Sequence, residues 1–247
     1  MKTLIAAIHG IMTSQTDPSW PDKFDAWMLN RDPEVKVLKK EYRAGPWPRW
    51  NCWIKDPRLA RSLANELELF LKPPTPFDPP ASTPLWFVAH SNGAVIALLT
   101  AKILVERGYK IAGLILTGAA CQADIAKNGI LELIGRGALG AIIAYCSHDD
   151  QVLAGDPARL EPENRNSKFK VLKSALWAKL MAPYGCLGRT GWLLDGEPLM
   201  GLDTAAVRTL TRWFPGGHST YFTRWNIERS FEQIYEDVSS GAQVQTP

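Results

Sequence analysis

The sequence predicts an α/β fold, with a mainly parallel central sheet and helices on both of its faces. Short apolar runs alternate along the chain with segments of helical periodicity, which is typical of strands joined by helical crossovers. Most of these runs are continuous, as expected for strands that are covered on both faces. The 247 residues, 46% of them hydrophobic, are enough for one large core, so we interpret residues 1–247 as a single domain.

Six segments have the composition of strands. The second and the last of them alternate between apolar and polar residues, whereas the other four are continuous apolar runs. In chain order the predicted strands are Leu4–Ile8, Val35–Tyr42, Leu85–Ala89, Ile111–Leu116, Ala141–Cys146 and Ala206–Phe214.

Helical periodicity fills the gaps between these strands. The clearest start signal is Asp56-Pro57, which we interpret as an N-cap Asp followed by Pro at the first helical position. The helix after it carries leucines on one face, and the last predicted helix is amphipathic. The predicted helices are Asp22–Leu29, the segment that follows Asp56, Asn92–Glu106, Asp124–Ile134, Lys168–Met181 and Thr220–Val238.

Two segments fit neither pattern and are candidate cap or lid loops. Residues 182–204 are rich in Gly and Pro, which favours an irregular loop or a short hairpin; a cap over a substrate pocket is the functional alternative. Residues 43–55 contain Trp47, Trp50 and Trp53 and follow a strand on the side where ligands bind in such sheets. These tryptophans either line an acyl or aromatic pocket or pack a long surface loop.

Composition argues against several classes of function. The net charge is only +3 and no dense basic run occurs, so we expect no nucleic-acid partner. The four cysteines are scattered without metal-ligand spacing, which predicts no metal site. No apolar stretch reaches about 18 residues, so we predict no transmembrane segment. The apolar run at the N-terminus stops at His9, too early for a signal peptide, and we therefore expect a cytoplasmic protein.

The most informative segment is LWFVAHSNGAV, residues 85–95. An apolar strand passes through Ser91 directly into an apolar helix, so Ser91 sits on a very tight turn with its hydroxyl lifted away from the backbone. The small residues Ala89 and Gly93 leave room for that turn. The Asn92 amide then lies at a helix N-terminus, where it can stabilise developing negative charge. A simpler interpretation is that Ser91 only caps the helix.

This segment resembles the nucleophile elbow G-x-S-x-G of the α/β-hydrolase superfamily, with Ala89 in place of the first Gly. The resemblance implies a compact α/β-hydrolase fold, a nucleophilic Ser91, and an acid and a histidine that follow it in that order. Of the four histidines, His218 lies on a Gly-rich loop after the last predicted strand. We therefore predict that His218 is the general base.

The acid is expected on a loop that follows a strand between Ser91 and His218. Two aspartates, Asp149 and Asp150, come soon after the predicted strand Ala141–Cys146. In the superfamily an apolar residue often stands two positions after the acid, and Val152 satisfies this for Asp150. We select Asp150 and keep Asp149 as its rival.

A second oxyanion donor is expected beside the Asn92 amide. The run His9-Gly-Ile-Met follows the first strand and resembles the His-Gly-x turn at which hydrolases of this superfamily place an oxyanion amide. By that resemblance the donor is the Ile11 amide, with Met12 as the adjacent alternative. Met12, Trp47 and Trp50 are also our candidate substrate-binding residues.

These features together imply a serine hydrolase that cleaves a carboxylic ester through an acyl-enzyme on Ser91. The expected substrate is a small-molecule or lipid-like ester, and the mechanism requires no metal or organic cofactor. The alternatives are a thioesterase, amidase or acyltransferase that uses the same three residues, or a non-catalytic binding protein of the same fold.

Overall fold

The computed structural model describes residues 2–10, 19–42, 54–72, 83–150, 152–153, 185–199 and 208–243. Within these ranges six strands form one sheet in which every neighbouring pair is parallel. The strand order is β2-β1-β3-β4-β5-β8, so the predicted α/β fold with a parallel central sheet is confirmed. The strands are β1 (Thr3–Ile8), β2 (Val35–Lys40), β3 (Leu85–His90), β4 (Gly113–Thr117), β5 (Ala141–Cys146) and β8 (Arg208–Trp213).

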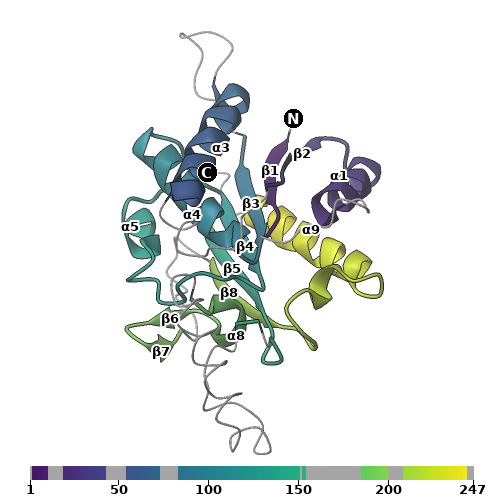
Figure 1. The fold of residues 1–247 in the computed structure, drawn as a ribbon. Coiled ribbons are helices and arrows are strands. Elements are labelled where there is room, and N and C mark those ends of the chain that lie inside the picture. Colours follow the sequence, from purple (N-terminus) through teal and green to yellow (C-terminus); the bar gives the residue numbers. More distant parts are fainter. Residues whose placement is uncertain are drawn as a thin grey trace, which may run out of the picture.

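Helices cover both faces of the sheet (Figure 1). One face carries α1 (Trp20–Arg31) and α9 (Ile227–Gln243), and the other carries α3 (Asp56–Leu71), α4 (Gly93–Glu106) and α5 (Ile130–Gly135). Shorter elements are α8 (Leu187–Thr190), a hairpin of β6 (Leu193–Leu194) and β7 (Glu197–Pro198), and the 3-10 helix η3 (Thr220–Phe222). No helix in the described ranges is long and apolar enough to cross a bilayer.

The alternation of side chains along each strand explains the continuous apolar runs. In β1, Leu4, Ala6 and Ile8 belong to the core beneath α3 and α4, whereas Ile5 and Ala7 belong to the core beneath α1 and α9. Every residue of β1, β3 and β5 is buried. Apolar side chains are therefore required on both faces of these strands.

Two predicted helices differ from the structure near their starts. The prediction Asp124–Ile134 is wrong in its first half, where the Asp124 carboxylate accepts hydrogen bonds from the backbone N–H groups of Ala126 and Asp195. Gly129 has φ +86°, a left-handed conformation that separates this turn from α5. At the C-terminal end η3 comes first and α9 starts only at Ile227. The predicted helix Lys168–Met181 lies outside the described residues.

The start of α3 also differs from its prediction. The N-cap is Lys55, which makes no side-chain capping bond, and Asp56 is the first residue of the helix. The Asp56 side chain is fully buried and bonds to the side chain of Asn92 instead. A tertiary contact therefore takes the carboxylate away from the capping role that the local sequence predicts.

The strand order places a topological switch point beside β1. This strand pairs with β2 on one side and with β3 on the other, and α1 and α4, which follow β1 and β3 in the chain, lie on opposite faces of the sheet (Figure 1). The carboxyl ends of β1 and β3 therefore face a region that neither helix fills. Open α/β sheets bind their ligands at such a point.

A glycine lets α4 start directly against this end of β1. A Cβ atom on Gly93 would lie 2.7 Å from the backbone oxygens of both Ile8 and His9. Real Cβ atoms do not approach backbone oxygens so closely, so any side chain here would push α4 away from the sheet. The small residue at this position is thus set by packing between β1 and α4.

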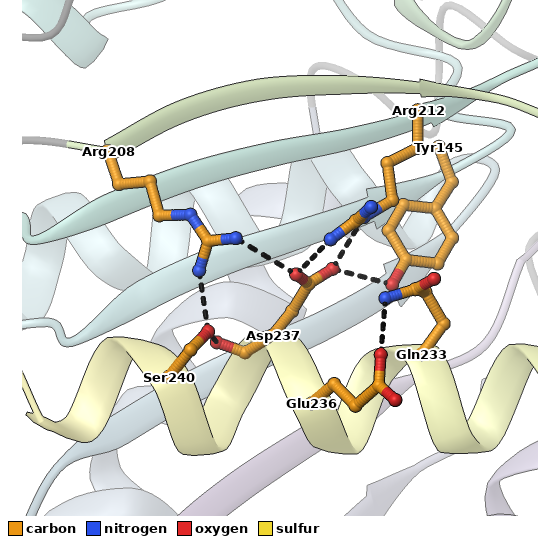
Figure 2. A network of polar contacts seen from close by, with 7 residues as sticks. All are labelled: Tyr145, Arg208, Arg212, Gln233, Glu236, Asp237 and Ser240. Atoms are coloured by element: carbon orange, nitrogen blue, oxygen red, sulfur yellow. Dashed lines mark hydrogen bonds and ion pairs between the residues drawn. The ribbon is translucent and has the colours of Figure 1, made fainter.

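A buried carboxylate fastens the last helix to the last strand (Figure 2). Asp237 on α9 is 1% exposed and accepts two hydrogen bonds from Arg212 of β8, at 2.6 and 2.9 Å. It also accepts bonds from the Tyr145 hydroxyl of β5 at 2.8 Å and from Arg208 at 3.4 Å. Because β8 and α9 flank the loop that carries His218, this cluster fixes both ends of that loop.

We expect Asp237→Ala to lower the free energy of unfolding by about 3 kcal/mol, because it leaves two arginines and a buried phenol without their acceptor. The neighbouring Glu236 is exposed, and Glu236→Ala is the control, with an expected change within about 0.5 kcal/mol. Urea denaturation followed by circular dichroism measures both. Equal effects of the two substitutions would contradict a special role for Asp237.

A matched pair of glycine substitutions tests the contact between α4 and β1. Gly93→Ala is expected to destabilise the protein by about 1–3 kcal/mol through overpacking. Gly135→Ala, at the end of α5, adds a Cβ that meets no atom within 4 Å and is expected to stabilise it by about 0.4–1 kcal/mol. Thermal unfolding of both variants gives the comparison; a stabilising Gly93→Ala would show that α4 is not held against β1 as described.

Candidate active site

Ser91 occupies the turn between β3 and α4. Its φ is +55°, a left-handed conformation that is uncommon for any residue other than glycine. Backbone hydrogen bonds hold it there: the Ser91 N–H donates to the Thr117 oxygen, and the Ser91 oxygen accepts from Ala94 and Ala120, all at 3.1 Å. The turn projects the hydroxyl above the carboxyl end of the sheet, as the sequence predicts.

The loop after β1 packs against this turn. A Cβ atom on Gly10 would lie 2.8 Å from Ser91 Cβ and 3.3 Å from the His90 oxygen. A side chain at Gly10 would therefore collide with the serine, so the turn leaves room only for glycine there. His9 next to it is partly exposed, and its Nδ1 lies 3.3 Å from the Gly10 oxygen.

Three side chains from separate loops form one hydrogen-bonded chain. His218 Nε2 lies 2.8 Å from Ser91 Oγ, and His218 Nδ1 lies 2.7 Å from Asp150 Oδ2. The loops follow β3, β5 and β8, so the parallel sheet brings them to the same edge. The His218 side chain is 12% exposed and that of Asp150 is fully buried. The alcohol therefore lies at the accessible end of the chain and the carboxylate at its buried end.

Asp150 is held rigidly beneath His218. Its Oδ1 accepts a hydrogen bond from the Leu153 N–H at 3.1 Å, and its backbone oxygen accepts one from Arg189 of α8 at 2.8 Å. The rival residue Asp149 is exposed, and among the described residues it bonds only through its backbone N–H, to Ser147 Oγ. The geometry therefore favours Asp150 over Asp149 as the partner of His218.

His90 supports the backbone of the His218 loop. It is 5% exposed, and its Nε2 lies 3.0 Å from the His218 backbone oxygen. Burial lowers the pKa of His90 to about 3, and the nearby His218 adds to this effect. A neutral ring whose Nε2 carries the proton then donates to that oxygen. No local signal in the sequence indicated this contact between His90 and the His218 backbone.

The backbone N–H and the side chain of Asn92 face different parts of the molecule. Within the described part of the chain, its backbone N–H donates to no protein acceptor, and it lies at the N-terminus of α4. Its side chain points into the core, where Nδ2 donates to the Tyr42 hydroxyl at 3.0 Å and to Asp56 Oδ1 at 3.2 Å. Tyr42 and Asp56 were not among the predicted site residues.

Several predicted site residues lie outside the described ranges. They are Ile11 and Met12 in the first loop, and Trp47 and Trp50 in the candidate cap segment 43–55. The second candidate cap segment, 182–204, is described at 185–199, where it forms α8 and the β6-β7 hairpin. Its helix reaches the site through Arg189, which no local signal in the sequence indicated.

Comparison with known proteins identifies the fold. No protein-family model matches the sequence, and no curated protein matches it. Among solved structures, ClbQ from the colibactin NRPS/PKS pathway aligns with a TM-score of 0.52 at 11% identity, over 99% of this chain and 100% of that one. Human thioesterase 2 aligns with a TM-score of 0.50 at 11% identity, over 98% of each chain. With its six parallel strands and the helices on both faces, the chain has the α/β-hydrolase fold.

Proposed function

We propose that this protein is a serine hydrolase that cleaves a carboxylic ester through an acyl-enzyme on Ser91. The observation that carries the proposal is the chain of two short hydrogen bonds from Ser91 through His218 to Asp150. A buried carboxylate, an imidazole and an alcohol in this order are the groups that activate a serine for acyl transfer. A serine that only capped the helix would not need an imidazole on its hydroxyl.

In the first half of the reaction His218 Nε2 removes the proton from Ser91 Oγ as that oxygen attacks the ester carbonyl. The tetrahedral intermediate then collapses, its bond to the alcohol oxygen breaks, and the imidazolium returns the proton to the departing alkoxide. In the second half His218 takes a proton from water as the water oxygen attacks the acyl-enzyme. The bond between the acyl carbon and Ser91 Oγ then breaks, the imidazolium returns its proton to Ser91 Oγ, and the acid leaves. Asp150 fixes the Nδ1–H tautomer and stabilises the imidazolium.

The oxyanion would be held by two backbone N–H groups. The Asn92 N–H is one of them, which is supported by its lack of a protein acceptor among the described residues and by the dipole of α4. The Ile11 N–H is the proposed second donor, supported by the close approach of Gly10 to Ser91. Met12, Trp47 and Trp50 stay predictions as substrate-binding residues.

Thioester hydrolysis is the second candidate. The same three groups serve both reactions, because a thiolate leaves the tetrahedral intermediate even more readily than an alkoxide does. The likeness in fold to human thioesterase 2 favours testing thioesters beside esters. At 11% identity the likeness concerns the fold, so the choice between the two leaving groups rests on measurement.

The three roles are tested by substitution. Ser91→Ala is expected to abolish labelling by a fluorophosphonate probe, which reacts with activated serines. Asp150→Asn is expected to lower kcat by about 10⁴-fold, because an amide stabilises the wrong tautomer of His218. Asp149→Asn is the matched control, with an expected change below about twofold. Absence of labelling in the unaltered protein would favour a binding protein, and a larger effect at Asp149 would reverse the assignment of the acid.

A substrate panel separates the two leaving groups. We expect p-nitrophenyl esters of short and medium acyl chains to be cleaved by the protein and not by its Ser91→Ala variant. The same acyl groups offered as thioesters give the ratio of kcat/KM between sulfur and oxygen leaving groups. A ratio well above that of the uncatalysed reactions identifies a thioesterase, and a ratio at or below it identifies an esterase.

A further inference from the structure

Three buried polar side chains meet behind the turn that carries Ser91. Asn92, Asp56 and Tyr42 are 0%, 0% and 8% exposed. Asn92 Nδ2 lies 3.0 Å from the Tyr42 hydroxyl oxygen and 3.2 Å from Asp56 Oδ1. The three residues come from the start of α4, the start of α3 and the segment after β2, so the cluster joins elements that are distant in the chain.

If Asp56 is ionised, this cluster has too few hydrogen-bond donors for its buried acceptor oxygens. Asn92 Nδ2 has two hydrogens and both are used. Asn92 Oδ1 and Asp56 Oδ2 are then two buried acceptors, and neither has a hydrogen-bond partner among the described residues. Buried oxygens without a donor are rare and costly. One additional proton between the carboxamide and the carboxyl would serve both of them.

The electrostatic surroundings favour that proton. Burial raises the pKa of Asp56 to about 6, against the opposing effects of the Asn92 hydrogen bond and the charge of Lys55. Asp56 has no ion pair with a described residue that would hold it as a carboxylate. Among the described residues, the other groups that face it are the Asn92 carboxamide from α4 and, beyond that, the Tyr42 phenol, and neither is charged. A hydrogen bond donated by the acid would stabilise the protonated form further, since only that form can donate.

We propose that Asp56, below the midpoint of its titration, is a neutral carboxylic acid that donates its proton to Asn92 Oδ1, so that the two side chains form a ring of two hydrogen bonds that positions the Asn92 backbone. Asp56 is thus a positioning residue and touches no substrate. The inference rests on the proposed function, because it takes the Asn92 N–H for an oxyanion donor. The ring fixes the side chain of Asn92. It thereby limits the orientations that the Asn92 N–H, the proposed oxyanion donor, can adopt.

Loss of the proton has a direct consequence for activity. Above the titration midpoint of Asp56, Asn92 Oδ1 and Asp56 Oδ2 are both acceptors, and they repel each other. The carboxamide must then turn or admit water, and the backbone of Asn92 moves with it. Because the neutral acid is the form that holds the turn, kcat falls on the alkaline side of this midpoint. The general base of the proposed mechanism is the unprotonated imidazole of His218. Raising the pH does not remove that form, so His218 cannot cause the fall in kcat.

The proton is observed directly on the unaltered protein. A titration of the Asp56 carboxyl carbon by NMR, with assignment from the Asp56→Asn variant, is expected to give a midpoint at or above about 6. A midpoint near the ordinary value of an aspartate, about 3.9, would overturn the proposal. This measurement is made on the unaltered protein and needs neither substrate nor activity.

Two substitutions test the positioning role. Asp56→Ala is expected to lower kcat by about 10–100-fold with little change in KM, because the oxyanion donor is misplaced. Asp56→Asn carries an amide N–H where the acid carries its proton, so it is expected to recover most of that loss and to remove the alkaline fall in kcat. Glu106 is exposed at the far end of α4, so Glu106→Gln is the matched control and should keep the pH profile of the unaltered protein.

The outcomes separate the ring from the proposed function. If fluorophosphonate labels Ser91 but Asp56→Asn is as impaired as Asp56→Ala, the ring is wrong and the hydrolase stands. If Ser91 is not labelled although Asp56 titrates at or above about 6, the hydrolase assignment is wrong and the protonated acid stands. An alkaline fall in kcat that persists in Asp56→Asn would also overturn the positioning role.

Discussion

The chain passes from β3 into α4 through only two residues, Ser91 and Asn92, and this turn constrains everything around it. The left-handed backbone of Ser91 costs of order 1–3 kcal/mol. Three backbone hydrogen bonds, to Thr117 and from Ala94 and Ala120, offset this cost. Glycine is required on both sides of the contact, at Gly10 and Gly93, because β1 and its loop lie against the turn. The lifted hydroxyl and the outward N–H of Asn92 follow from the same geometry.

The parallel sheet supplies the remaining groups. Since all its strands point the same way, the loops after β1, β3, β5 and β8 emerge at one edge, and residues far apart in sequence meet there. Beneath this edge each catalytic candidate has its own support. Arg189 and Leu153 hold Asp150, His90 holds the backbone of His218, and Asp56 holds the side chain of Asn92.

Local patterns in the sequence predicted the strands and the candidate residues of the site. The strand Ala141–Cys146 starts and ends at the predicted residues, because full burial on both faces demands an unbroken apolar run. His218 and Asp150 were found from chain order and from the few histidines available. Their mutual distances agree with the predicted site, whereas their roles in catalysis stay predictions.

Long-range contacts limited the remaining predictions. Asp56 carries every local sign of an N-cap, but a partner 36 residues away in sequence takes its carboxyl. His90 contacts the backbone oxygen of His218, 128 residues away in sequence. No motif with a fixed residue spacing predicts a contact of this kind. At α5 the error was local: Asp124 bonds to the backbone that follows it and Gly129 turns left-handed, so the apolar periodicity did not extend to the first half of the predicted helix.

The cluster around Asp237 gives the molecule an order of assembly. Ser91 and the first four strands of the sheet leave the ribosome well before β8, and α9 follows later still. The contacts of Asp237 with Arg212 and Tyr145 join the two elements that flank the His218 loop. A nascent chain that lacks β8 and α9 therefore has Ser91 without its hydrogen bond to His218, and that bond forms only after both elements are made.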